Sequence, residues 1–239
     1  MIKALIFDAD GPLYYRSAEV LDRQLALLQA YGYPGHLDHR GLNHLNKYGH
    51  TGSLDQYNTA YEAEKFKAYA REESEFLMVR RILHALSLKL PNAKLSYFVT
   101  ALNRILSQVT AQPGAKTALS NLKASGYQIC ILTDSFHPST EKWRWFSRIG
   151  LAPYIDHIVS SYDIRTLKDT PEAYQACLDT LQTAANQTVF IGHQPYEMTG
   201  ARRAGIRSVA IMPIAPPDIK SDYKVNSIND LPTLLKQLS

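Results

Sequence analysis

The sequence has little cysteine. Among its 239 residues only Cys130 and Cys177 occur, with no CxxC pair and no ladder of spacings. A disulfide framework is therefore not expected. We expect both to be buried free thiols in a protein of a reducing compartment.

Long hydrophobic runs are also missing. The apolar run at the N-terminus, residues 4–7, meets Asp8 at once. It is far shorter than the apolar region of a secretory signal or a membrane span. We therefore predict cytoplasmic residence and no membrane partner.

Charge of one sign is not concentrated anywhere. The formal net charge is +4, and the basic pairs Arg80-Arg81 and Arg202-Arg203 stand far apart in the sequence. A nucleic-acid footprint would need clustered basic residues, so no nucleic-acid partner is predicted. A small anionic substrate is compatible with this balance.

The sequence does contain the pattern of one buried strand, followed by helices, and then by a regular alternation of helices and strands. Residues 2–7 form a continuous apolar run that stops in a turn, as expected for a strand buried on both faces. Helical spacing follows at 17–32 and around 38–48, 54–75, 76–90 and 95–110, with no convincing strand between residues 37 and 109. Beyond residue 113, helices at 113–125, 139–149, 171–183, 197–204 and 230–238 alternate with strands at 128–132, 157–161, 188–191 and 208–212.

This alternation predicts an α/β fold with a doubly wound parallel sheet. The helical block after the first strand is roughly 90 residues long, much longer than an ordinary connection. We therefore predict a core formed by residues 1–14 and 111–239, with an all-α cap domain inserted at 15–110. The chain beyond Met212 is expected to be an extended connection to the last helix.

Polar residues follow the predicted strands, at the edge where open parallel sheets bind ligands. Asp8 and Asp10 follow the first strand, and Thr133 ends the second. Lys168 lies in the loop after the third strand, and His193 and Glu197 follow the fourth.

These residue types suit phosphoryl transfer. Two carboxylates two residues apart, Asp8 and Asp10, suit a nucleophile beside a second carboxyl that shuttles a proton. Lys168 would hold a phosphate and keep Asp8 ionised, and the Thr133 hydroxyl would add a donor. The alternative interpretation of the two aspartates is a solvated turn, which the ordered set of companions disfavours.

On these residues the chain resembles the haloacid dehalogenase superfamily, in its phosphatase-like branch with a helical C1-type cap and a Rossmann-like core. The resemblance covers essentially the whole chain. Asp8-Ala9-Asp10-Gly11-Pro12 is similar to the first motif, which implies Asp8 as nucleophile and Asp10 as general acid/base. The second motif ends in Thr133-Asp134-Ser135, with Thr133 and Ser135 as phosphate- or substrate-binding residues, and Lys168 is the lysine of the third.

The fourth motif departs from the family pattern. The family has Gly-Asp-x-x-x-Asp, and this chain has Gly192-His193-Gln194-Pro195-Tyr196-Glu197. The resemblance implies a divalent cation, Mg²⁺ in the family, held here by Asp8, by Asp10 through its backbone carbonyl, and by His193 and Glu197. Because imidazole suits Mn²⁺ or another transition metal better than Mg²⁺, we expect lowered Mg²⁺ affinity. His193 is either tolerated in a decayed site or an imidazole that replaces the metal or binds a different one.

Two neighbouring positions refine this expectation. Pro12 stands where the family has Thr or Val and removes one backbone donor beside the site. The presence of Asp10 favours phosphate chemistry. The haloalkanoate dehalogenases of the superfamily resemble DxYGT at this motif and lack the second acid.

Substrate contacts are expected from the start of the cap, by family analogy alone. The candidates are Arg40, Lys47, Tyr48 and His50. The histidines of this region fit no standard metal-ligand spacing, so surface or cap-lining roles are expected for them.

The leading hypothesis is a phosphatase that hydrolyses a small phosphorylated metabolite through an aspartyl-phosphate. One alternative is a catalytically impaired protein of the same fold with a binding or regulatory role, for which His193 is the main support. Another is a phosphomutase or phosphotransferase, which uses the same core residues. The sequence does not give the substrate or the oligomeric state.

Overall fold

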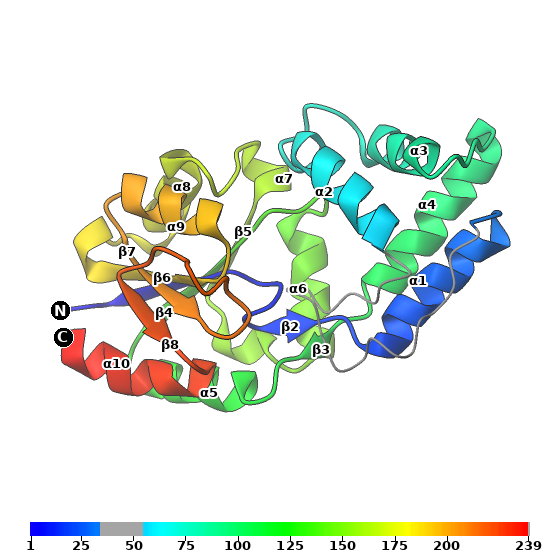
Figure 1. Ribbon diagram of the computed structural model, residues 1–239. Helices are drawn as coiled ribbons and strands as arrows, with labels where there is room; N and C mark the ends of the chain where they lie inside the picture. Colours follow the sequence, from blue (N-terminus) through cyan, green and yellow to red (C-terminus); the bar gives the residue numbers. More distant parts are fainter. Residues whose placement is uncertain (34–54, 239) are drawn as a thin grey trace. The chain divides into compact units, whose positions relative to one another are not determined.

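The computed structural model describes residues 1–33 and 55–238 (Figure 1). It consists of two compact units, one formed by Met1–Tyr15 with Ala111–Ser239 and one by Arg16–Thr110. The first unit contains the sheet and the second contains the inserted helices.

The core of the first unit is a six-stranded, fully parallel sheet. Its strands are β1 (Ala4–Phe7), β4 (Gln128–Thr133), β5 (His157–Ser160), β6 (Thr188–Gly192), β7 (Arg207–Ile211) and β8 (Tyr223–Val225). They lie in the order β5-β4-β1-β6-β7-β8, and Phe7 pairs with Ile131 on one side and Ile191 on the other. The predicted α/β fold with a parallel sheet is confirmed.

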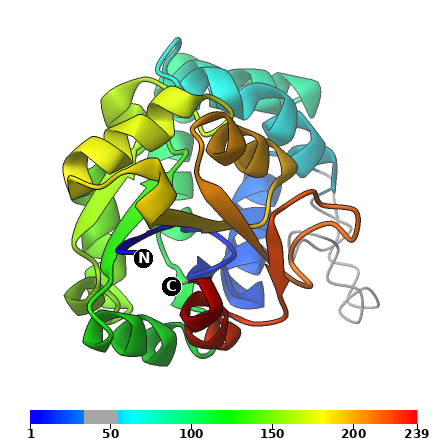
Figure 2. The same ribbon diagram turned by 90° about the vertical axis from the view of Figure 1, so that its left-hand side faces the viewer.

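Helices cover both faces of this sheet. In Figures 1 and 2, α8 (Pro171–Leu181) and α9 (Pro195–Arg203) lie on one face, and α5 (Ala115–Ala124) and α10 (Leu231–Leu238) lie on the other. Ala4 and Ile6 of β1 pack into one buried cluster with residues of α8 and α9. The apolar run of the first strand is thus explained by burial on both faces. The unit also contains α6 (Ser139–Arg148), the short α7 (Ser161–Ile164) and the 3₁₀ turns η3 (Ala152–Tyr154), η4 (Ala185–Gln187) and η5 (Ile228–Asp230).

The described part of the second unit is helical. It contains α1 (Ala18–Ala30), α2 (Asp55–Tyr69), α3 (Glu75–Ala85) and α4 (Asn92–Leu106). Buried residues recur on one face of α1, α3 and α4, and α1 and α3 each pack on α4. The inserted helical block predicted from the sequence is therefore present, although the helix expected at 38–48 lies outside the described residues.

Three short strands were not expected from the sequence. The segment beyond Met212, expected to be an extended connection, contains β8, which pairs in parallel with β7 at the sheet edge. Two-residue strands, β2 (Tyr14–Tyr15) and β3 (Thr110–Ala111), form a second sheet. Elements of two or three residues are too short for a periodic pattern, and Lys224 of β8 is exposed as on an ordinary surface segment.

Both cysteines are buried and free, as predicted. Among the residues that the structure describes, no helix is long and apolar enough to cross a membrane.

Candidate active site

The candidate site lies at the carboxyl ends of β1 and β6. At this point the order in which strands are added to the sheet reverses. β4 and β5 lie on one side of β1, while β6, β7 and β8 lie on the other. Crossover connections leave such a point in opposite directions and open a crevice there. Asp8 directly follows β1, and its backbone N–H donates to the Ile191 carbonyl oxygen at 2.8 Å. The nucleophile candidate therefore lies at the end of β1, directly beside β6.

Three charged side chains form a buried chain of ion pairs at this edge of the sheet. Lys168 Nζ donates to Asp8 Oδ1 at 2.5 Å and to Glu197 Oε1 at 2.5 Å. All three side chains are buried. A buried ammonium between two carboxylates satisfies both, whereas either carboxylate alone would be costly to desolvate.

Glu197 is fixed by the helix that carries it. It lies in the first turn of α9, where its Oε2 accepts from the backbone N–H groups of His193 (3.1 Å) and Gln194 (3.0 Å). This is a carboxylate satisfying free donors at a helix N-terminus. Glycine at position 192 leaves space for the Glu197 carboxylate, because a Cβ there would lie 2.6 Å from Glu197 Oε2.

The loop that carries Lys168 is held from two sides. The Lys168 backbone N–H donates to the Asp134 carboxylate at 3.2 Å. On the other side α9 packs so closely that a Cβ at Gly200 would lie 1.9 Å from the Lys168 carbonyl oxygen. Lys168 is thus positioned by its backbone as well as by its ion pairs.

The electrostatics keep Asp8 ionised. Burial raises the pKa of Asp8, but the charge and hydrogen bond of Lys168 and the close contact with His193 outweigh it and leave the pKa at about 2. Burial lowers the pKa of Lys168, yet Asp8 and Glu197 together hold it well above its usual range. For Asp134, burial dominates and raises the pKa to about 6. A buried carboxylate that stays charged at neutral pH is suited to act as a nucleophile.

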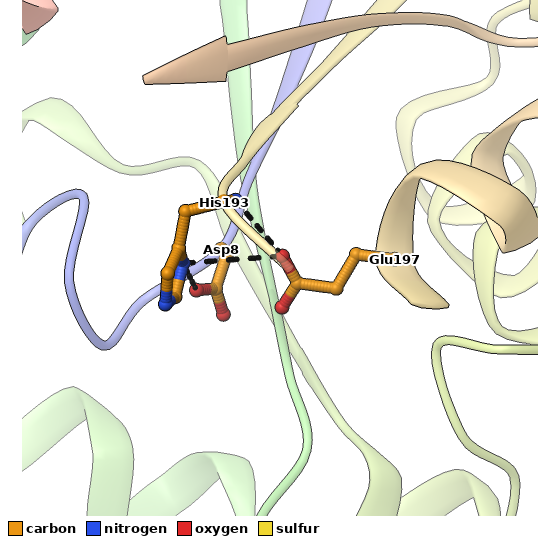
Figure 3. Close-up of side chains that lie close together, drawn as sticks. All are labelled: Asp8, His193 and Glu197. Carbon is orange, nitrogen blue, oxygen red and sulfur yellow. Dashed lines mark hydrogen bonds and ion pairs between the residues drawn. The ribbon is translucent and has the colours of Figure 1, made fainter. Parts of the chain in front are cut away.

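The His193 ring lies beside Asp8, at the carboxylate oxygen that Lys168 does not contact. Its Nδ1 is 3.2 Å from Asp8 Oδ2 and 4.0 Å from Glu197 Oε2 (Figure 3). Nδ1 is buried, and it has no well-aligned hydrogen bond to the described residues. The ring packs against Gly11, where a Cβ would lie 3.0 Å from His193 Cε1. Burial lowers the pKa of His193, but the neighbouring carboxylates outweigh it and raise the pKa above its ordinary value.

The other predicted core residues lie at the same edge of the sheet. Thr133 is the last residue of β4 and is buried. Asp10 follows Asp8 by two residues, is exposed, and forms a bridge with Tyr14. Ser135 is buried, with its hydroxyl oxygen accepting from the His137 N–H at 3.0 Å, so it shapes the turn after β4. The proposed cap contacts Arg40, Lys47, Tyr48 and His50 lie outside the described residues.

Sequence reasoning missed two supporting residues. Asp134 holds the Lys168 backbone, and the Tyr174 hydroxyl donates to the Glu197 carbonyl oxygen at 2.6 Å. Asp134 directly follows the predicted Thr133, so its place beside a strand end was a usable signal. Tyr174 ends the run from Lys168 that resembles the family's third motif, so its place in that run was a usable signal as well.

Asp8, His193 and Glu197 also form the potential metal-binding group of the described residues. Each offers one ligand atom, and these atoms lie within 4.8 Å of one another. Asp10 was placed among the ligands through its backbone carbonyl, which a group of side-chain atoms does not include, so that contact stays a prediction.

Comparison with known proteins places these features in context. The family model for haloacid dehalogenase-like hydrolases matches residues 2–205. The chain is 24% identical to glyceraldehyde 3-phosphate phosphatase from Methanocaldococcus jannaschii over 245 residues, covering 100% of this chain and 99% of the relative. It is 29% identical to (S)-2-haloacid dehalogenase 1 from a Pseudomonas species over 145 residues, which is 57% of this chain but only 63% of that relative.

Solved structures give the same fold at low identity. The chain is similar to a putative β-phosphoglucomutase from Thermotoga maritima, with a TM-score of 0.71, 19% identity and full coverage of both chains. It is also similar to L-2-haloacid dehalogenase from Xanthobacter autotrophicus, with a TM-score of 0.69, 18% identity and full coverage of both chains. At these identities the likeness is evidence for the fold alone.

Proposed function

The chain belongs to the haloacid dehalogenase-like hydrolases, and from this membership we propose that it hydrolyses a small phosphomonoester with Asp8 as the nucleophile. The observation that carries the proposal is the pairing of a buried, ionised Asp8 with a second carboxyl, Asp10, two residues later. Phosphate esters need both groups, because the leaving alkoxide must be protonated.

The proposed reaction has two steps. An Asp8 carboxylate oxygen attacks phosphorus, the bond from phosphorus to the ester oxygen breaks, and Asp10 gives its proton to the departing oxygen. Asp10 then removes a proton from water, which attacks the phosphorus of the aspartyl-phosphate. Inorganic phosphate leaves, and both carboxyl groups return to their starting states.

Lys168 and Thr133 are proposed to hold the transferring group. The ammonium of Lys168 already contacts Asp8 Oδ1, so a phosphoryl group on Asp8 would lie beside this positive charge. Positive charge placed in advance stabilises the negative charge on the phosphoryl oxygens in the transition state. The Thr133 hydroxyl, at the end of the neighbouring strand, would add a hydrogen-bond donor.

The divalent cation expected from the family fits this donor set poorly. Mg²⁺ requires near-octahedral coordination by hard oxygen ligands. Both oxygens of Glu197 are engaged, one by Lys168 and one by two backbone N–H groups. Asp8 Oδ1 is bound to Lys168. Of the three potential ligands, only Asp8 Oδ2 and the nitrogen of His193 remain, so no step of the proposed mechanism is assigned to a metal.

We assign substrate selection to the inserted helical unit, residues 15–110. Its proposed contacts are Arg40, Lys47, Tyr48 and His50, which stay predictions. The phosphatase relative acts on glyceraldehyde 3-phosphate, as its name states. Together with the scattered charge of this chain, that relative supports a small phosphorylated metabolite as the substrate class.

A second candidate is hydrolysis of a carbon–halogen bond. It is favoured by His193, which removes a metal-binding carboxylate, and by the relatives named haloacid dehalogenases. In that reaction Asp8 would attack carbon and release a halide. A halide is a stable anion that needs no proton, so Asp10 would have no role in its departure.

One assay separates the two candidates. Purified protein is incubated with a panel of phosphomonoesters and with 2-haloacids, and released phosphate and halide are measured for wild type, Asp8→Asn and Asp10→Asn. The phosphatase proposal predicts phosphate release that falls about 10²- to 10⁴-fold in Asp10→Asn, as loss of a general acid commonly causes, and that disappears in Asp8→Asn. Halide release that survives Asp10→Asn would instead support the second candidate.

A further inference from the structure

His193 occupies the position of the family's first metal-binding aspartate, and its ring is turned toward Asp8. The contact from Nδ1 to Asp8 Oδ2 is 3.2 Å (Figure 3). Asp8 therefore has one oxygen facing Lys168 and the other facing His193. The carboxylate is enclosed by nitrogen atoms on both sides.

The surroundings hold this ring in place. Its Nε2 lies 2.7 Å from Gln194 Nε2, and its Cε1 edge packs against the backbone at Gly11. The ring is buried at the strand end that follows β6. A cation bound to Asp8 Oδ2 would have to share the space that this ring fills.

Glu197 cannot supply the missing ligands without losing its own bonds. Its Oε1 is 2.5 Å from Lys168 Nζ, and its Oε2 closes the first turn of α9 through two backbone N–H groups. Withdrawing it would expose two helix donors and one buried ammonium, each of which is costly to leave unpaired. Catalytic zinc usually has three protein ligands, and Mg²⁺ prefers carboxylate oxygens. Of the side-chain atoms in this group, only Asp8 Oδ2 and a nitrogen of His193 are not already bonded to Lys168 or to the start of α9.

We propose that His193 takes the place of the divalent cation beside Asp8, so that this enzyme works without a bound metal ion. The proposal rests on the assignment of Asp8 as the nucleophile, and it holds for either leaving group. Its test is a binding measurement, so that it can fail independently of the proposed reaction.

The test compares metal binding by the full chain and by three variants. Chelator-treated protein is titrated calorimetrically with Mg²⁺, Mn²⁺, Co²⁺ and Zn²⁺, and Mn²⁺ binding is repeated by electron paramagnetic resonance. The variants are Asp8→Ala, His193→Asp and the double variant. His157→Asp is the matched control, because it makes the same exchange at the start of β5, at the opposite end of the strands.

The proposal predicts that wild type has no saturable site sensitive to Asp8→Ala. It also predicts that His193→Asp gains a saturable Mn²⁺ site, with an affinity at least about tenfold above any residual Mn²⁺ binding by wild type, a usual size for changes around a metal ligand. The double variant should lose that site, and His157→Asp should not gain one.

Two results would overturn the proposal. One is a saturable site in wild type, for any of the four metals, that Asp8→Ala removes. The other is a folded His193→Asp protein, judged by circular dichroism, that gains no Mn²⁺ site. If His193→Asp does not fold, the comparison of wild type with Asp8→Ala still decides.

Discussion

The central residue of the site is Lys168, because its ammonium joins two buried carboxylates. It lies 2.5 Å from Asp8 Oδ1 and 2.5 Å from Glu197 Oε1. Removing one partner of a buried ion pair leaves the other charges without compensation, which is more damaging than losing a surface pair. Lys168 therefore contributes to stability as well as to the proposed chemistry.

Lys168→Met should lower the free energy of unfolding by about 3–5 kcal/mol, the usual cost of breaking a buried pair from one side. Lys123→Met is the control. Lys123 pairs with Asp156 at 2.7 Å with both side chains about one-third exposed, and a surface pair contributes only about 0–1 kcal/mol. Urea denaturation of both variants measures the difference. Equal losses would contradict the buried network.

At this scale the sequence predicted which residues meet, but not how their atoms are used. Strand-end positions brought Asp8, Lys168 and Glu197 to one edge of the sheet. The sequence could not indicate that Glu197 is bonded through both oxygens, because that depends on the start of α9 at Pro195. Nor could it indicate the direction of the His193 ring, which depends on the space left at Gly11.

Among the elements, α9 matters most for the site, since it packs directly on the loop that carries Lys168. The contact occurs at Gly200, where a Cβ would lie 1.9 Å from the Lys168 carbonyl oxygen and 2.7 Å from Tyr174 Cε2. A backbone atom cannot rotate away as a flexible side chain can. Only glycine permits this approach without a shift of helix or loop.

Gly200→Ala should therefore destabilise the protein by at least about 1–3 kcal/mol, the usual cost of overpacking a core, and lower hydrolysis by moving Lys168. The preceding residue, Thr199, gives a control in the same helix, because Thr199→Ala removes only a hydroxyl bonded to the Pro195 carbonyl. Urea denaturation and the substrate assay report the two effects. An unchanged Gly200→Ala protein would refute this packing argument.

In the helical unit, Glu75 begins α3 and is largely buried. Burial raises the pKa of Glu75 from 4.5 to about 7, although a hydrogen bond from Asn103 opposes this. The native state thus holds the proton more tightly than the unfolded chain. Because the unfolded state binds fewer protons between pH 4.5 and 7, stability from this group falls as the pH rises through that window.

Glu75→Gln should raise the free energy of unfolding at pH 8 by about 1–3 kcal/mol and change it little at pH 4. The Glu75 Oε1 atom is buried and has no hydrogen-bond partner among the described residues, so a neutral amide loses little there. Exposed Glu72 supplies the control Glu72→Gln. Denaturation at both pH values measures the difference, and a gain independent of pH would argue against burial as the cause.

The helices and strands were predictable where the apolar pattern spans several turns or a full strand. α6, for example, runs from Ser139 to Arg148 against an expectation of 139–149. β8 was missed because its three residues alternate weakly and its place depends on pairing with β7. Long-range pairing of this kind is not visible in a local pattern.

For the whole molecule, the order of the strands places the site. The order in which strands are added to the sheet reverses between β1 and β6. The loops carrying Asp8 and His193 therefore leave the sheet at the same point. The alternation of helices and strands predicted a parallel sheet, and parallel sheets bring strand ends together at one edge. The match of the family model over residues 2–205 agrees with this architecture. The core motifs do not determine the substrate, and we assign its selection to the inserted unit.

The most direct test of Asp8 as the nucleophile is mass spectrometry of the protein after it is mixed with a phosphomonoester that it hydrolyses and quenched with acid. Acid preserves an aspartyl-phosphate long enough for peptide mapping. We predict a phosphoryl group on the peptide that contains Asp8, and its absence in Asp8→Asn. Phosphate release that continues in Asp8→Asn, or a phosphoryl group found on another residue, would contradict the account.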